Sequence, residues 1–223
     1  MVSKPVDNRR IGHFLSIVAR SVERFEAPVV SLIAQGSRDP FRVLVSTLLS
    51  ARTKDDVTAD ASARLFKVAR TADGIASLSE SRIAKLIYPV CFYKTKASNL
   101  KKTCRVLRER FAGEVPQTID ELVKLPGVGR KTANLVLIEG FRIPAICVDT
   151  HVHRITNLWG YVETETPAQT EMDLRAKLQR HHWLDLNRLL VSFGQHTCVP
   201  RSPLCSKCPL EKRCPRIGVE RSR

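Results

Sequence analysis

The sequence contains no apolar run of about 18 residues, which excludes a membrane-spanning helix of ordinary length. It also lacks a secretory signal, because no apolar stretch with a small-residue cleavage site follows the charged start at residues 1–5. Neither an internal repeat nor a low-complexity segment is present. Seven cysteines in a chain without an export signal indicate reduced thiols rather than structural disulfides. We therefore expect a cytoplasmic protein in which clustered cysteines bind metal.

Acidic residues are scarce relative to basic ones. Asp and Glu number 22 against 37 Lys and Arg, which gives a net charge of +15 and an isoelectric point near 9.9. Such a surplus favours a polyanionic partner, because neutralising phosphates releases counterions. A charge that only keeps the protein soluble is the alternative. The length of 223 residues suits one large domain or two small ones with a core that needs no disulfides.

The alternation of apolar and polar residues that is typical of strands does not form a convincing run. Apolar residues instead recur at helical spacing, and the sequence predicts an all-α fold of about ten helices. The expected helices cover 11–25, 40–48, 57–65, 83–87, 100–111, 118–125, 130–139, 150–159, 167–180 and 185–197. The helical pattern is interrupted near 26–38 and near 143–148.

A glycine-rich turn joins two of these helices. Leu125-Pro126-Gly127-Val128-Gly129 lies between a helix opened by a capping box at Thr118 and a helix that begins near Arg130. Glycines allow a tight turn and close approach to a ligand, and the amides of the following helix attract phosphate. An ordinary helix–helix turn has the same composition. The net charge makes backbone contacts to DNA or RNA through Gly127, Val128, Gly129 and Arg130 the better interpretation.

Lys131 lies in the first turn of the helix after the glycines. It is either a phosphate contact or a nucleophilic amine, and a nucleophile must lose its proton first. Asp149 precedes an apolar stripe and reads as a helix N-cap. A rigid, ionised cap also suits a group that accepts a proton or stabilises a developing sugar cation.

Four cysteines near the C-terminus are separated by six, two and five residues: Cys198, Cys205, Cys208 and Cys214. Four thiolates within 17 positions can surround one metal centre. One C-x-x-C step with two flanking cysteines suits a cubane cluster better than a zinc ribbon, although zinc also accepts four thiolates.

Three segments together resemble the endonuclease III family of DNA glycosylases. They are LPGVGRKTAN at 125–134, VDTHVHR at 148–154 and the C-x6-C-x2-C-x5-C run. The resemblance extends from about residue 40 to residue 214, and the combination is far more specific than any one motif.

The resemblance implies two helical domains that flank a DNA cleft. A six-helix barrel with the helix-hairpin-helix would cover 37–143. A discontinuous four-helix domain of 1–36 and 144–223 would carry a [4Fe–4S] cluster on Cys198, Cys205, Cys208 and Cys214.

The resemblance also implies the chemistry. Lys131 matches the lysine that attacks C1′ of a damaged nucleotide and forms a Schiff base, and Asp149 matches the assisting aspartate. Substrates are oxidised pyrimidines, which are excised, and abasic sites, which are cut 3′ by β-elimination. The expected partner is double-stranded DNA containing these lesions, and the expected state is a cytoplasmic, nucleoid-associated monomer.

Further DNA contacts follow by resemblance. A damaged nucleotide must leave the duplex, and Phe92 matches the wedge that fills the gap, although core packing is an equal alternative. Arg52 stands where the family often has a second gap-filling glutamine, which puts the opposite-base preference in doubt. His151 matches a residue that contacts DNA or only completes a helix start. Arg201 and Lys207 are candidate phosphate contacts in the cysteine loop.

Two alternatives remain open at this stage. A monofunctional mismatch glycosylase of the same superfamily generally lacks a lysine at the position of Lys131. Adenine-removing relatives usually carry an extra C-terminal domain, whereas this chain ends nine residues after Cys214. A non-catalytic iron–sulfur protein that binds DNA would not need Lys131 and Asp149 together.

Overall fold

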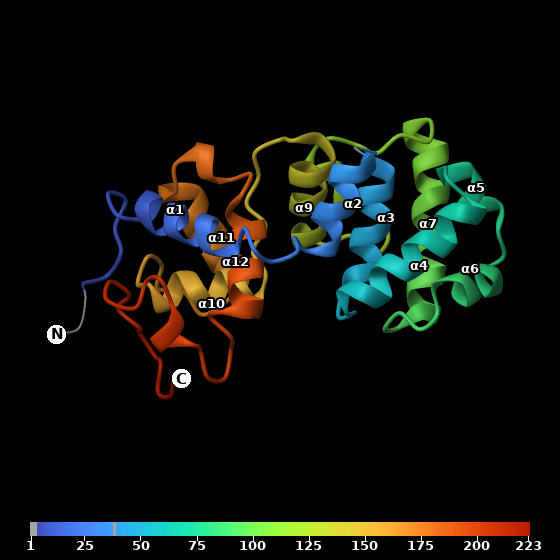
Figure 1. Ribbon diagram of the computed structural model, residues 1–223. Coiled ribbons are helices and arrows are strands. Elements are labelled where there is room, and N and C mark those ends of the chain that lie inside the picture. The colour runs from blue at the N-terminus through green and yellow to red at the C-terminus, as the bar shows by residue number, and fades with distance from the viewer. Residues whose placement is uncertain (1–3, 38) are drawn as a thin grey trace. The chain divides into compact units, whose positions relative to one another are not determined.

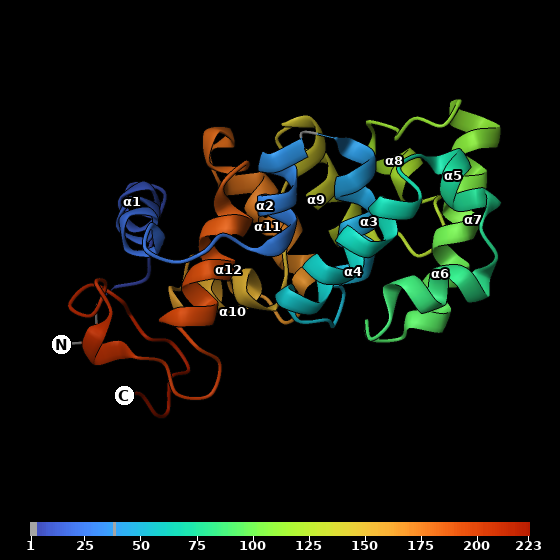
Figure 2. The same cartoon turned by 45° about the vertical axis from the view of Figure 1, so that its right-hand side comes forward.

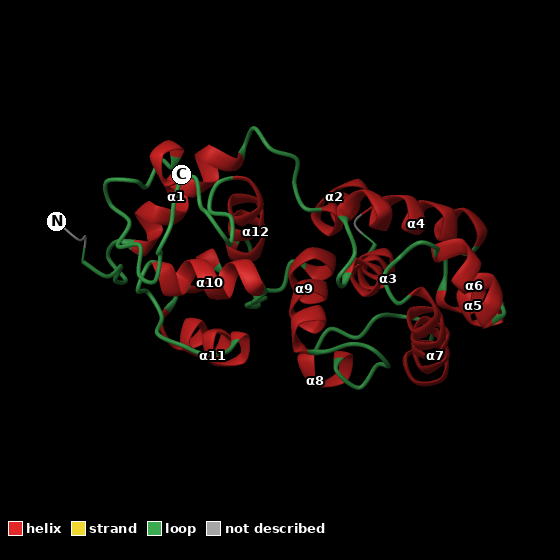
Figure 3. Ribbon diagram, turned by 90° about the horizontal axis from the view of Figure 1, so that it is seen from below, coloured by secondary structure: helices red, strands yellow, loops and turns green. Residues whose placement is uncertain are grey.

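The computed structural model describes residues 4–37 and 39–223, and within these residues the chain forms helices and no strand (Figure 3). The predicted all-α class is confirmed. Twelve α-helices are present in the described part: α1 (Ile11–Val22), α2 (Val29–Ser37), α3 (Pro40–Ser50), α4 (Asp55–Val68), α5 (Ala72–Ser77), α6 (Glu80–Ile87), α7 (Tyr93–Phe111), α8 (Ile119–Leu122), α9 (Arg130–Phe141), α10 (Thr150–Leu158), α11 (Pro167–Lys177) and α12 (Leu186–His196). None of the described helices is long and apolar enough to cross a membrane.

The chain divides into two compact units. The first unit runs up to Pro28 and resumes at Ile146–Arg223, and the second is Val29–Ala145. In the first unit, α1 and α10 pack against α12, and α10 also contacts α11 (Figure 1). In the second unit α3 is central, because it contacts α2, α4, α7 and α9.

The first unit has a core of aliphatic and aromatic side chains. Phe14 of α1 meets Trp159 edge to face, with ring centroids 5.3 Å apart, and Phe193 of α12 is fully buried. After α12 the chain forms loops with a short 3₁₀ turn at Cys205–Lys207, coloured red in Figure 2. These loops lie close to the start of the unit, because the Arg10 guanidinium donates to the Arg213 carbonyl at 3.2 Å.

The observed units begin and end at other positions than the boundaries expected at 37 and 144. Residues 26–38 contain a helix, α2, although Pro28 and Gly36 interrupt the sequence pattern there. The second unit includes α2 because this helix packs against α3, α4 and α9. The Ser31 hydroxyl on α2 also donates to the Glu139 carboxylate on α9 at 2.6 Å.

Candidate DNA-binding and catalytic site

The glycine turn is anchored on α7. Thr118 caps helix α8, and the buried side chains of Leu122 and Leu125 hold the segment to the core. The Thr103 hydroxyl of α7 donates to the Pro126 carbonyl at 2.7 Å. These contacts fix the approach to the turn.

Gly127 needs to be glycine for two reasons. Its φ of +80° is rarely adopted by residues with a side chain. A Cβ at this position would also lie 3.1 Å from Nδ2 and 3.3 Å from Cβ of Asn99 on α7. An alanine here would therefore require the Asn99 side chain to shift by a few tenths of an ångström.

The start of α9 is suited to an anion. Gly129 is the N-cap and supplies no side-chain acceptor for the first amides, and no carboxylate occurs in the first turn. The helix N-terminus carries partial positive charge, and the exposed Arg130 and Lys131 add two cationic side chains in the same turn. This part of the second unit therefore offers amides and cations to a phosphate.

Asp149 caps α10 in the first unit. Its Oδ1 accepts the amides of His151 and Val152, each at 2.9 Å, as expected for an N-cap. Both bonds use the same oxygen, Oδ1. The cap holds this half-buried carboxylate in one orientation, which suits a catalytic role as well as a structural one.

His151 lies against α12 at Gly194. A Cβ at residue 194 would come within 2.7 Å of the His151 Cγ, so only glycine leaves room for the ring. Arg154, one turn later on α10, approaches His151 Nδ1 at 3.5 Å and also donates to the Cys198 carbonyl. Sequence reasoning named His151 but missed Gly194, because only the packing of α10 on α12 gives this glycine its role.

Arg52 and Phe92 occupy neighbouring exposed turns of the second unit. Each has a φ of 56°, in the left-handed region. The Phe92 side chain is 59% exposed, which excludes core packing for this residue. The Arg52 guanidinium carbon lies 6.0 Å from the Phe92 ring centroid. The structure thus brings the two candidate gap-filling residues together, although α4, α5 and α6 separate them in the chain.

The four C-terminal cysteines line one cavity of the first unit, together with apolar side chains that include Trp159, Phe193 and Leu210. All four are free, half-buried thiols. Within the described ranges, no three His, Cys, Asp or Glu side chains are grouped so as to hold a metal ion. The four thiols thus line the same cavity without forming such a group.

The chemistry of this donor set fits an iron–sulfur cluster. The Leu210 amide donates to Cys208 Sγ at 3.4 Å, and the Arg154 guanidinium donates to Cys198 Sγ at 3.5 Å. N–H groups directed at sulfur stabilise cluster thiolates. Burial raises the pKa of the Cys208 thiol to about 12, so a cationic centre is needed to hold it as a thiolate.

Arg201 and Lys207 are both exposed on the cysteine loop. Arg201 lies between the first two cysteines, and Lys207 ends the 3₁₀ turn that starts at Cys205. Their placement is compatible with phosphate contacts made by the loop.

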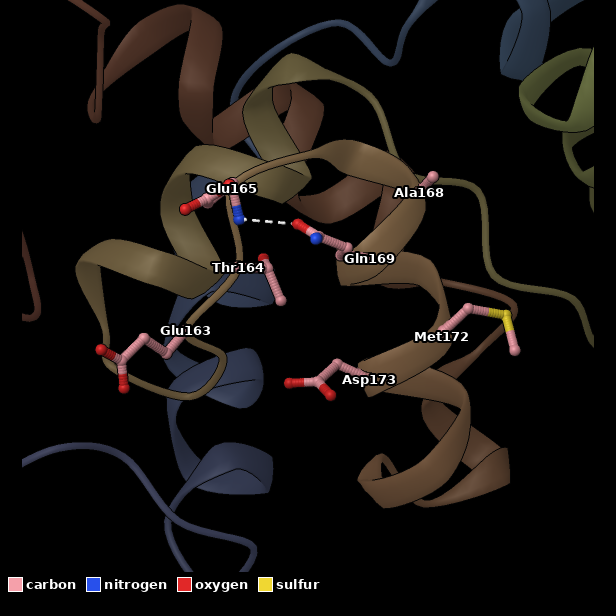
Figure 4. A pocket seen from close by; sticks show the side chains of 7 residues that line it. All are labelled: Glu163, Thr164, Glu165, Ala168, Gln169, Met172 and Asp173. Carbon is pink, nitrogen blue, oxygen red and sulfur yellow. Dashed lines mark hydrogen bonds between the residues drawn. The ribbon is translucent and has the colours of Figure 1, made fainter.

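An open pocket on the first unit has a different character. Its lining includes Glu163, Glu165 and Asp173, and the Glu165 amide donates to Gln169 at 2.9 Å (Figure 4). Three carboxylates repel a phosphate backbone. This pocket contains none of the candidate site residues.

Comparison with known proteins identifies the class. The protein-family model HhH-GPD, described as HhH-GPD superfamily base excision DNA repair protein, matches residues 45–180. Endonuclease III of Thermotoga maritima is 47% identical over 176 residues, which cover 79% of this chain and 83% of that protein. Endonuclease III of Escherichia coli K12 is 37% identical over 200 residues, 90% of this chain and 93% of that protein. A trapped endonuclease III–DNA covalent intermediate superposes with a TM-score of 0.84 at 32% identity, covering 94% of this chain and 96% of that one.

The fold and the glycine hairpin thus define a base excision DNA repair protein of the helix-hairpin-helix class. Within that class the chain belongs to the endonuclease III family, and it is a DNA glycosylase and abasic-site lyase. The resemblance inferred from the three sequence segments is confirmed.

Proposed function

We propose that this glycosylase and lyase excises oxidised pyrimidines from double-stranded DNA and cuts abasic sites, with Lys131 as the nucleophile. The observation that carries the proposal is the start of α9, where an exposed lysine shares the first turn with an N-cap that has no side chain. A phosphate bound to these amides would bring a sugar close to the lysine amine. The two compact units would serve as the two domains that bind the duplex.

The Lys131 amine attacks C1′, and the bond from C1′ to the damaged base breaks, so that the base leaves with the bonding electrons. Asp149 accepts a proton from the amine or stabilises the positive charge that develops on the sugar. The C1′–O4′ bond then opens and O4′ takes up a proton, which leaves an imine between Lys131 and C1′. Loss of a C2′ proton from this imine breaks the C3′–O bond and expels the 3′ phosphate, and water hydrolyses the imine to release the enzyme. Gly127, Val128, Gly129 and Arg130 hold the backbone phosphate during these steps.

A base inside a duplex is out of reach, so the damaged nucleotide must rotate out at a cost of a few kcal/mol. Phe92 fills the gap and Arg52 hydrogen-bonds the orphaned base, and both are exposed on adjacent turns. Oxidised pyrimidines that have lost ring planarity stack poorly, which lowers the cost of displacement. His151, Arg201 and Lys207 supply further DNA contacts, and the protein acts as a monomer on nucleoid DNA.

Cys198, Cys205, Cys208 and Cys214 would hold a [4Fe–4S] cluster. When bound, the cluster joins four thiolates to one centre and so keeps the loop that carries Arg201 and Lys207 in shape. Excision itself uses Lys131 and Asp149. Visible absorbance and iron content of the purified protein test this assignment, with Cys208→Ser expected to lower both and the buried Cys104→Ser to leave both intact. A colourless protein that contains zinc would overturn it.

The nucleophile is tested by borohydride reduction on duplex DNA containing thymine glycol. We expect the wild-type protein and Lys124→Ala to form a covalent adduct, and Lys131→Ala to form none. Lys124 is an exposed lysine just before the turn, so it controls for lost charge. An adduct with Lys131→Ala would assign the nucleophile elsewhere. Base release by the wild-type protein without an adduct would favour a monofunctional glycosylase.

A further inference from the structure

Lys96 lies in the first turn of α7 and points its ammonium at the turn that carries Arg52. Its Nζ is 2.7 Å from the Leu49 carbonyl oxygen and 2.6 Å from the Ala51 carbonyl oxygen. A third contact of 3.2 Å reaches the Thr53 hydroxyl. An ammonium has three donors, and these three acceptors all belong to the end of α3 and the turn that follows it.

The same residue is bonded to the turn that carries Phe92. The Lys96 amide donates to the Phe92 carbonyl at 2.9 Å, as part of the first turn of α7. The Cys91 amide donates to the Thr53 hydroxyl at 3.2 Å, which links the two turns a second time. The ammonium and the hydroxyl therefore connect the Arg52 turn to the Phe92 turn.

Both turns hold a residue in a costly conformation. Arg52 follows α3 and Phe92 caps α7, each with a φ of 56°. A left-handed conformation is strained for a residue with a side chain, and it persists only where the surroundings enforce it. The contacts of Lys96 and Thr53 with these turns provide that enforcement.

The stability of α7 does not explain a lysine at position 96. A cation in the first turn of a helix faces the positive end of the helix dipole. Partial burial lowers the pKa of the Lys96 ammonium to about 8, although the neighbouring Cys91 acts in the opposite direction. The carbonyls at the negative end of α3 account for the lysine instead.

We propose that Lys96 is a positioning residue that holds Arg52 and Phe92 together as one rigid gap-filling pair. This inference rests on the proposed function, in which the two side chains replace the displaced nucleotide. A loosened pair would still allow excision once the lesion is outside the duplex. It would lower the rate wherever the lesion must be separated from a partner base.

Two duplexes separate this role from a general loss of structure. In one, thymine glycol pairs with adenine, and in the other it lies opposite a tetrahydrofuran abasic analogue, so no partner base is orphaned. We expect Lys96→Met to be at least about 10-fold slower than wild type on the first duplex under single turnover, and within about threefold on the second. Lys94→Met removes an exposed charge from the same helical turn and should change both rates by the same factor.

Thr53→Val provides a second test that keeps the ammonium and removes one of its acceptors. We expect the same substrate-dependent pattern with a smaller amplitude, so the inference remains testable if Lys96→Met fails to fold. Equal slowing on both duplexes, or no slowing on the adenine duplex, would overturn the positioning role. If the wild-type protein excises thymine glycol from neither duplex, the proposed function fails, and the inference fails with it.

Discussion

The Arg52 guanidinium and the Phe92 ring lie side by side, with 6.0 Å between the guanidinium carbon and the ring centroid. This distance is at the outer limit for a cation–π contact. The two residues belong to different turns, one after α3 and the other before α7, and both turns are bonded to Lys96. Their proximity makes the pair, rather than either residue alone, the natural candidate for filling a gap in DNA.

Phe92→Ala should slow excision of thymine glycol paired with adenine by about 10-fold or more, because the vacated gap loses its apolar filler. The free energy of unfolding should fall by less than about 1 kcal/mol, since the side chain is mostly exposed. Single-turnover kinetics and chemical denaturation measure the two effects. Leu32→Ala, at an exposed apolar position on α2, is the matched control and should leave the rate unchanged. Equal rates for Phe92→Ala and wild type would remove Phe92 from the mechanism.

Asp149→Asn should slow turnover by about 100-fold with DNA affinity retained, because the amide can cap α10 but cannot take up a proton. Asp149→Ala should be equally slow and should also lose about 1 kcal/mol of stability with the cap. Borohydride trapping rates, DNA titrations and thermal melts distinguish these contributions. Normal turnover by Asp149→Asn would limit Asp149 to capping.

Gly127→Ala should lower both stability and DNA affinity. The left-handed φ costs about 1 kcal/mol, and the added Cβ presses on Asn99 and displaces the turn. Gly113→Ala is the matched control, because Gly113 has a φ of +85° but no atom within 4 Å of the added Cβ. We expect the control to lose stability alone. If both variants bind undamaged duplex DNA as well as wild type in an anisotropy titration, the turn does not contact the backbone.

The lowered pKa of Lys96 predicts a pH dependence of stability. Its folded pKa of about 8 lies below the unfolded value near 10.5, so between these values the unfolded chain binds more protons. Stability due to this group therefore rises as the pH increases through this range. The free energies of unfolding of wild type and Lys96→Met can be measured by denaturation from pH 7 to 10. We expect the wild-type value to increase relative to that of Lys96→Met as the pH rises. Burial raises the pKa of Cys104 to about 12, so the stability due to this thiol falls as the pH rises. Both proteins contain Cys104, and comparing them removes its contribution. A constant difference would contradict the desolvation of the ammonium.

Local sequence patterns were sufficient to predict most of the helices, but they did not predict α2 and α5. Helix α5 has only six residues, too few for a periodic stripe. Helix α2 contains Gly36 and follows Pro28, so its sequence reads as a break, and its contacts with α3, α4 and α9 stabilise it regardless. Tertiary packing outweighed local propensity at α2, whereas α5 was missed because it is short.

By itself, the sequence determined the all-helical class and the family, and it supplied the candidate site residues, because helical periodicity, glycine turns and cysteine spacing are local patterns. It could not single out Lys96 among 37 basic residues, or Gly194 among ten glycines. Only the tertiary structure decided these roles, since the Lys96 ammonium meets Leu49 only when α7 packs on α3, and the His151 ring needs space only when α10 packs on α12. Such contacts depend on the distances between helices, and no short stretch of sequence encodes them.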